Sequence, residues 1–182
     1  DIFVGTSMLH LNFDGNELKK LDDGSYQLHL YDDEQKVGAD LNFAPKKPVT
    51  RHGDNGIVRG VGGEDMFYYF IPKCEVKGSV ILEDKKNEIT EASGWYDHEF
   101  GKSRDEKEDD AVKDIAWNWL AVQLDNGCEL SVANLFNTKR NYRGCGHWAI
   151  YIDEKGERHT FDEFYFKPLN SWTSMRTFND YP

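Results

Sequence analysis

The chain has 182 residues, of which 22 are basic and 33 acidic, so its formal net charge is −11. Hydrophobic residues make up 38% of the sequence, which is enough for a core and excludes a disordered chain. The negative charge argues against nucleic acid and anionic lipid as partners, because both carry charges of the same sign. No apolar run is long enough to form a transmembrane segment.

Apolar and polar residues alternate through most of the chain, which is typical of half-buried β-strands. Turn residues separate the alternating runs, and Asp125-Asn126-Gly127 between two apolar runs is the clearest hairpin. No stretch has a sustained helical period. In chain order we expect strands at 25–32, 36–44, 65–71, 74–83, 88–99, 115–125, 128–136, 147–153 and 158–167.

Many closely spaced strands with no helices between them predict an all-β antiparallel fold, either a sandwich or a barrel. Several runs are longer than the usual strand of about five or six residues, which favours a closed or nearly closed barrel. We find no internal repeat or linker, so we expect one β-domain over residues 1–182. The acidic stretch 102–114 is expected to be a surface insertion, with a docking segment for a basic partner as the alternative.

The two ends and the cysteines leave the cellular context open. The sequence begins at Asp1 without a recognisable targeting segment and stops at Pro182 without a tail, so we expect a fragment of a longer chain. Its compartment stays unknown. The three cysteines, at 74, 128 and 145, are an odd number without metal-type spacing, and free thiols are expected.

The segment 94–101, GWYDHEFG, places four ionisable or hydroxyl side chains in a row between two glycines. On a strand, successive side chains point to opposite faces. Trp95, Asp97 and Glu99 would then share one face. The other face would carry the intervening residues Tyr96, His98 and Phe100. Each face of this strand therefore combines aromatic and ionisable groups, which a plain solvent-facing strand end does not require.

The run 116–127, AWNWLAVQLDNG, gives a second candidate surface. Trp117, Trp119 and Gln123 fall on one face together with a small alanine, and the other face is mostly aliphatic. In a barrel, one face lines the interior and the other packs outside. The aromatic face is therefore a candidate wall of an apolar pocket.

These residues suggest one reaction. Asp97 could form a general acid–base pair with His98 or Glu99. Burial beside Trp95 would raise the carboxyl pKa and keep the group protonated. Such a donor suits hydration of a carbon–carbon double bond, because aromatic faces stabilise the carbocation formed on protonation. Alternatively, Asp97 and His98 form a structural hydrogen-bonded pair at the barrel rim.

Metal and cofactor chemistry have little support in the sequence. The residues Asp97, His98, Glu99 and His147 have no spacing that requires a metal ion. Neither a nucleophile elbow nor a phosphate-binding glycine loop is present. We therefore expect a site without a metal or a cofactor.

Several motifs occur in an order that resembles one protein family. They are YQL at 26–28, LNFAPKKPV at 41–49, HGDNG at 52–56, YYFIP at 68–72, VKG at 76–78, GWYDHEFG at 94–101, WNW at 117–119, QLDNG at 123–127, WTS at 172–174 and YP at 181–182. Together they resemble the lipocalin-like carotenoid 1,2-hydratase (hydroxyneurosporene synthase) superfamily, also called AttH-type. The likeness covers about 26–182, and the acidic stretch 102–114 departs from the family pattern.

The resemblance implies two consecutive lipocalin-like β-domains, of which this chain would be most of the first. It implies an apolar polyene or isoprenoid ligand held within or between the domains without a cofactor. Asp97 would be the proton donor of a hydratase, with His98 and Tyr96 as further catalytic candidates. The expected partners are this ligand and a second β-domain or another protein. The expected ligand-binding residues are Trp95, Glu99, Trp117, Trp119 and Gln123.

Two other functions stay open on the sequence alone. One is a non-catalytic lipocalin-like module that binds a ligand or serves as a structural subunit of a larger, membrane-associated or photosynthetic assembly. The other is a pericyclase-type cyclase, in which the shape of the pocket directs the reaction and no acid is needed.

Overall fold

The computed structural model describes residues 2–4, 8–53, 55–59, 65–101, 114–140 and 143–181. The regular structure within these ranges is antiparallel β. No helix among them is long and apolar enough to cross a membrane. The strands are β1 Ile2–Val4, β2 His10–Phe13, β3 Asn16–Lys20, β4 Tyr26–Asp32, β5 Val37–Pro45, β6 Thr50–Arg51, β7 Ile57–Arg59, β8 Asp65–Leu82, β9 Lys85–Gly101, β10 Ile115–Gln123, β11 Glu129–Asn137, β12 Arg143–Ile152, β13 Arg158–Phe161, β14 Trp172–Thr173 and β15 Asp180–Tyr181.

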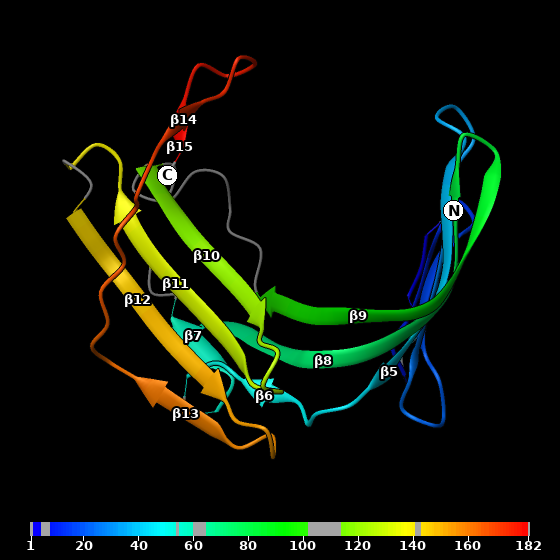
Figure 1. Ribbon diagram of the computed structural model, residues 1–182, viewed down its shortest axis with the longest axis horizontal. Helices are drawn as coiled ribbons and strands as arrows, with labels where there is room; N and C mark the ends of the chain where they lie inside the picture. The colour runs from blue at the N-terminus through cyan, green and yellow to red at the C-terminus, as the bar shows by residue number, and fades with distance from the viewer. Residues whose placement is uncertain are drawn as a thin grey trace.

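Strands β1 to β9 form one large sheet in the order β1-β2-β3-β4-β5-β8-β6, with β7 and β9 also paired to β8. This sheet curls into a half-barrel, with the N-terminal strands at one end of the long β8–β9 ribbon (Figure 1). Strands β10 to β13 form a second sheet near the other end of that ribbon. Strands β14 and β15 pair in a small separate hairpin.

The ribbon bends where proline interrupts strand β8. The β8–β9 register shifts between Ile71 and Cys74, and Pro72 lies within the shift. Proline has no N–H group for the ladder, so a bulge is one of the few places where an inner strand accepts it. The proline thus bends β8 without ending it, and the 18-residue strand continues into both halves of the large sheet.

A second irregularity requires a glycine. The register shifts again between Val76 and Gly78, where Gly78 has a φ of +138°. A Cβ atom at this position would lie 2.0 Å from the carbonyl oxygen of Asp40 on strand β5. Since no side chain fits at that distance, Gly78 permits the close approach of β5 and β8 in the curled part of the sheet.

The two faces of the large sheet pack against different partners. On the concave face, Tyr26, Ile71 and Cys74 form a buried cluster. On the opposite face, Phe70 packs against Ile150 and Ile152 of strand β12. The first cluster fills the half-barrel, and the second attaches the β10–β13 sheet to the β8–β9 ribbon.

A buried ion pair ties the two sheets together. The Nζ atom of Lys47 lies 2.6 Å from Oε2 of Glu129, and the two side chains are only 9% and 2% exposed. The same ammonium group donates at 2.6 Å to the carbonyl oxygens of Gly127 and Asp153. The segment after β5 is therefore fixed to the β10–β11 turn and to the end of β12. This arrangement gives Lys47, the second lysine of the LNFAPKKPV motif, a structural role.

The structure confirms the all-β antiparallel fold and most of the expected strands. The Asp125-Asn126-Gly127 hairpin is also confirmed, since Gln123 pairs with Glu129 across it. The expected break between 71 and 74 is wrong, because the bulge at Pro72 keeps β8 continuous. The last expected strand, 158–167, ends at Phe161.

Two further expectations concern the shape of the fold and the cysteines. In place of a closed barrel, the described strands form a half-barrel and a second sheet. The three cysteines are free thiols, as expected. The acidic stretch 102–114 lies outside the described residues except for Asp114.

The Lys47 ion pair leads to a stability prediction. Lys47→Met should lower the free energy of unfolding by about 3–5 kcal/mol, because it leaves the buried Glu129 carboxylate unpaired. Urea unfolding followed by tryptophan fluorescence measures this change. The matched control is Lys46→Met, since Lys46 is exposed and its partner Glu75 also contacts Lys77, so its loss should matter much less. Equal losses in the two variants would contradict the structural role given to Lys47.

Candidate functional site

The GWYDHEFG segment lies in the last part of strand β9, beyond the bulge. Its side chains alternate between the two faces of the sheet. Tyr96 stacks on Tyr26 in the half-barrel, with ring centroids 4.7 Å apart. Trp95 instead stacks on Phe70 at 4.9 Å, on the face that meets the second sheet. The alternation expected from the sequence is therefore present in the structure.

This alternation separates Asp97 from His98. Asp97 contacts Tyr68 on the face that carries Trp95, whereas His98 contacts Tyr69 on the concave face. Neighbouring residues of a strand cannot share a face, so Asp97 and His98 do not form an acid–base pair or a hydrogen-bonded pair at a rim. Glu99 shares the face of Asp97 and is the carboxyl group nearest to it in sequence on that side.

The Asp97 carboxyl lies beside aromatic side chains. The Tyr68 hydroxyl donates a hydrogen bond to Oδ1 of Asp97 at 3.0 Å. Burial raises the pKa of Asp97, and the Trp95 indole and the Tyr68 hydroxyl oppose this rise. Burial and the Asp97 charge also raise the pKa of Glu99. Both side chains are exposed to solvent on strand β9, so this carboxyl pair can exchange protons with the outside.

A buried histidine supports Tyr68 from behind. The His52 ring stacks on the Tyr68 ring with centroids 3.9 Å apart, and its edge meets Trp148 at 5.2 Å. The His52 Nε2 atom has no hydrogen-bond partner among the described residues. Burial, together with the positive charge of Arg158, lowers the pKa of His52 to about 4. The imidazole is therefore neutral at physiological pH.

The concave face carries a tyrosine–histidine cluster. The Nδ1 atom of His98 lies 2.8 Å from the Tyr69 hydroxyl oxygen and 3.3 Å from that of Tyr96. Burial, followed by the hydrogen bond with Tyr69, raises the pKa of Tyr96. The Tyr96 hydroxyl therefore stays protonated and can donate a hydrogen bond to a neutral polar ligand.

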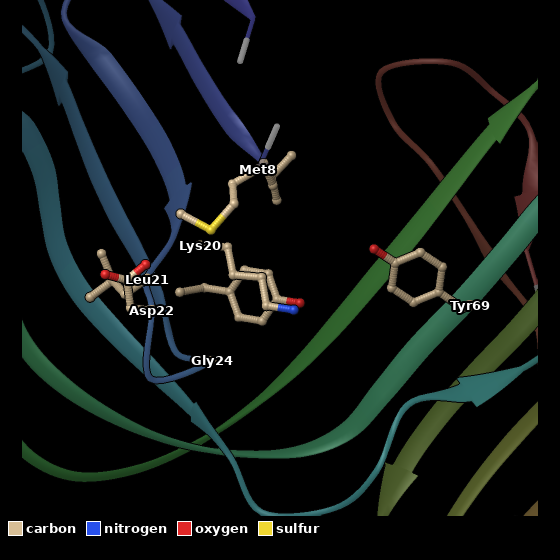
Figure 2. Close-up of a pocket in the computed structure, with 8 residues that line it drawn as sticks. Met8, Lys20, Leu21, Asp22, Gly24 and Tyr69 are labelled. Carbon is tan, nitrogen blue, oxygen red and sulfur yellow. The ribbon is translucent and has the colours of Figure 1, made fainter. Parts of the chain in front are cut away.

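A trough of about 520 Å³ lies beside this cluster. Figure 2 shows Tyr69 pointing into it from strand β8, with Met8, Lys20 and Leu21 on the opposite wall. Tyr26 also lines the trough, and Lys20 Nζ lies 5.7 Å from the centroid of its ring. The trough combines apolar surface with a few polar groups, as small-molecule sites commonly do. Asp97 does not line it.

The other expected binding residues lie on the second sheet. Trp119 pairs with Ala133, which pairs with Trp148, so both tryptophans are on the face that meets the β8–β9 ribbon. Trp117 shares this face and is 66% exposed, whereas Trp119 is 40% exposed. Trp95, Asp97, Glu99, Trp117 and Trp119 therefore belong to the two sheet faces that are turned toward each other.

The side-chain amide of Gln123 is engaged in structural hydrogen bonds and does not face a ligand site as a free group. Its Nε2 atom donates to the carbonyl oxygens of Pro72 at 2.7 Å and Gly94 at 3.0 Å. These carbonyl groups belong to the bulge of the β8–β9 ribbon, where the ladder is interrupted. Gln123 therefore joins the end of strand β10 to the bend and satisfies backbone groups that the bulge leaves unpaired.

Among the described residues, one group of side chains has metal-ligand geometry. It consists of Asp153 and Glu157 in the β12–β13 turn and His159 on strand β13, with their ligand atoms within 4.8 Å of one another. Asp153 Oδ1 already accepts hydrogen bonds from the backbone N–H groups of Lys155 and Glu157, which is an ordinary turn arrangement. His147 contacts the Asp162 carbonyl oxygen and does not join Asp97.

Comparison with known proteins decides the family. The sequence profile described as AttH-like matches residues 3–182. The chain belongs to the AttH-like family. No curated protein sequence matches it significantly.

Two solved structures share the fold of this AttH-like chain. One is assigned as an AttH of Nitrosomonas europaea, with a TM-score of 0.80 and 21% identity over 98% of this chain and 54% of its own. The other is kievitone hydratase of Nectria haematococca, with a TM-score of 0.70 and 17% identity over 97% and 53%. The chain therefore spans about half the length of these relatives, and at these identities the likeness establishes the fold alone.

Tyr68 and His52 were not among the residues expected at the site. Both occur in motifs of the AttH-like resemblance, but spacing along the chain does not reveal that they meet. Their contact depends on the pairing of β6 and β7 with the first half of β8, which brings the HGDNG turn beside Tyr68. A sequence pattern gives the face of each residue but not the register between strands.

The low pKa of His52 predicts a pH dependence of stability. The unfolded chain takes up a proton on His52 near pH 6.5, whereas the folded chain does so only near pH 4. The unfolding free energy should therefore fall as the pH drops through this window, with a contribution on the order of 3 kcal/mol from His52. Urea unfolding near both pH values measures it. In His52→Phe this part of the pH dependence should disappear, and an unchanged slope would contradict the assignment.

Proposed function

We propose that this chain forms one part of a cofactor-free hydratase site, in which Asp97 protonates a carbon–carbon double bond of an apolar polyene or isoprenoid ligand. The supporting observation is the Asp97 carboxyl itself. Its pKa is raised by burial, it accepts a hydrogen bond from Tyr68, and it lies beside Trp95. A carboxyl group with a raised pKa remains protonated to a higher pH than an aspartate surrounded by water alone.

In the proposed reaction, the Asp97 proton moves to one carbon of the double bond, and a carbocation forms at the other. The faces of Trp95 and Trp119 lie on the two surfaces turned toward each other and can stabilise positive charge. Water then adds to the cation, and its surplus proton passes to the Asp97 carboxylate. The carboxyl group is thereby restored and no redox partner is required.

The likeness to kievitone hydratase gives this proposal its reaction class. That protein is named as a hydratase, and it shares the fold at a TM-score of 0.70. The chain matches only about half of it, so the complete site includes a second β-unit in this proposal. Exposed apolar side chains fit such a contact, among them Phe13 on the half-barrel and Tyr165 and Leu169 near the C-terminal hairpin. With that unit in place, the half-barrel would close into a lipocalin-like barrel.

One observation favours a second function, that of a non-catalytic binding module. The trough of about 520 Å³ lies on the concave face with Tyr69, whereas Asp97 is on the opposite face. A ligand bound in the trough would contact tyrosine hydroxyl groups and apolar side chains, but not the acid. In that case Asp97 and Tyr68 would stabilise the sheet and the ligand would leave unchanged.

Mutation of Asp97 separates the two functions. In the hydratase, Asp97→Asn should lower the hydration rate at least about 100-fold, because the amide cannot donate the proton, while ligand affinity changes little. The measurement uses the polyene or isoprenoid extracted from the natively purified protein, with incorporation of oxygen from labelled water followed by mass spectrometry. Glu88→Gln is the matched control, since it removes an exposed carboxylate from the same strand outside the GWYDHEFG segment and should cost much less.

The outcomes of this experiment are distinct. A bound ligand that gains no water with the unmodified protein would support the binding module. Equal rates for the unmodified protein and Asp97→Asn would remove Asp97 as the acid. A solvent extract without any ligand, from a protein purified with other subunits, would support a structural role.

A further inference from the structure

We propose that Tyr68 and His52 are positioning residues for Asp97, and that Gly53 and Gly56 serve to hold them in place. This inference rests on the proposed function for its catalytic meaning, since it concerns how the proposed acid is oriented. Its structural content can be tested without any substrate.

Tyr68 of strand β8 lies close to Asp97 of strand β9. In the β8–β9 register Tyr68 is opposite Glu99, and Phe70 is opposite Asp97. Tyr68 and Asp97 are therefore diagonal neighbours on one face, a distance that only a long side chain can span. The tyrosine hydroxyl reaches Oδ1 of Asp97 at 3.0 Å. The hydrogen bond fixes one oxygen of the carboxyl group.

Backbone hydrogen bonds and a stacked ring hold Tyr68 in place. Its backbone N–H donates to the carbonyl oxygen of Gly56 at 2.9 Å, and its carbonyl oxygen accepts from the N–H of His52 at 3.0 Å. The His52 ring then lies nearly parallel to the Tyr68 ring, with an interplanar angle of 16°. Both the backbone and the ring of Tyr68 are therefore attached to the HGDNG turn.

The backbone conformation near His52 requires glycine at two positions. Gly53 has a φ of +58°, and a Cβ atom there would lie 2.4 Å from the carbonyl oxygen of Ile57. Gly56 has a φ of +82°. Residues with side chains would open the turn at both positions. A wider turn would withdraw His52 from the Tyr68 ring, so the glycines are needed for the stacking.

His52 also contacts the second sheet. The His52 ring meets Trp148 of strand β12 edge-on at 5.2 Å, and it also contacts Phe70 at 5.0 Å. The attachment of the second sheet therefore covers His52 and keeps it neutral. A neutral ring can stack on Tyr68 without adding a charge near Asp97. The orientation of the acid thus depends on the contact between the two sheets.

The chemical consequence concerns the ionised form of Asp97. When Asp97 has given up its proton, the Tyr68 hydrogen bond stabilises the carboxylate. Burial and the Asp97 charge raise the pKa of Tyr68, so the phenol remains a donor throughout. Glu99 of β9 is a further titratable group on this face, and Arg158 is the positive group that acts on His52.

Tyr68→Phe tests the inference with the smallest change. The variant removes only the hydroxyl, so the carboxylate loses a donor and the Asp97 pKa should rise. At a fixed pH above that pKa, the protonated fraction of Asp97 should increase about threefold to tenfold. Carbon-13 NMR of the aspartate carboxyl groups over a pH series measures this in the whole protein, with Asp97→Asn to assign the signal.

Tyr69→Phe is the matched control, because Tyr69 is the neighbouring tyrosine and its hydroxyl contacts His98 on the opposite face. It should leave the Asp97 pKa unchanged. An unchanged Asp97 pKa in Tyr68→Phe, or the same rise in both variants, would overturn the inference.

Variants of His52 test the stacking step. His52→Ala should release the Tyr68 ring and raise the Asp97 pKa in the same direction as Tyr68→Phe, and His52→Phe should restore it. Tm values show whether each variant folds, and Tyr68→Phe remains decisive if they do not. A protein that hydrates no ligand but shows these shifts would refute the proposed function and retain the positioning role. A protein that hydrates the ligand but shows no such pKa shifts would support the proposed function and refute the positioning role.

Discussion

The pairing of β8 with β9 is the constraint on which the rest of the structure depends. These two strands, of 18 and 17 residues, belong to both halves of the large sheet and also support the second sheet. Side chains on a strand alternate between faces, so the ribbon presents one set of groups to the half-barrel and another to β10–β13. The tyrosine–histidine cluster and the Asp97 carboxyl are separated by this alternation alone.

Several family motifs acquire a physical meaning from the contacts around this ribbon. Lys47 of the LNFAPKKPV motif is buried in an ion pair with Glu129, and Gln123 of the QLDNG motif binds the carbonyl groups at the bulge. These residues compensate for backbone and charged groups that the bent sheet would otherwise leave unpaired. Much of the resemblance therefore records how the two sheets are joined, and the residues near Asp97 form a smaller part of it.

The sequence predicted a good part of the candidate site because strand alternation is visible in a single chain. It placed Trp95, Asp97 and Glu99 on one face, and Trp117 with Trp119 on another, and the structure turns these faces toward each other. It offered His98 or Glu99 as the partner of Asp97, and of these two residues the alternation leaves only Glu99 on the same face. It also assigned Gln123 to a ligand, although the amide is occupied by the bulge. The trough and its lining residue Met8 had no signal in the sequence.

The sequence by itself determined the strand content, the hairpin at Asp125-Asn126-Gly127, the faces of the main strands and the family, because each of these depends on local periodicity or short motifs. Only the tertiary structure decided that Pro72 bends a strand without ending it, that the large sheet stops at a half-barrel, and that His52 and Tyr68 meet behind Asp97. These features depend on register and on packing between segments far apart in the chain, and a linear pattern does not specify either.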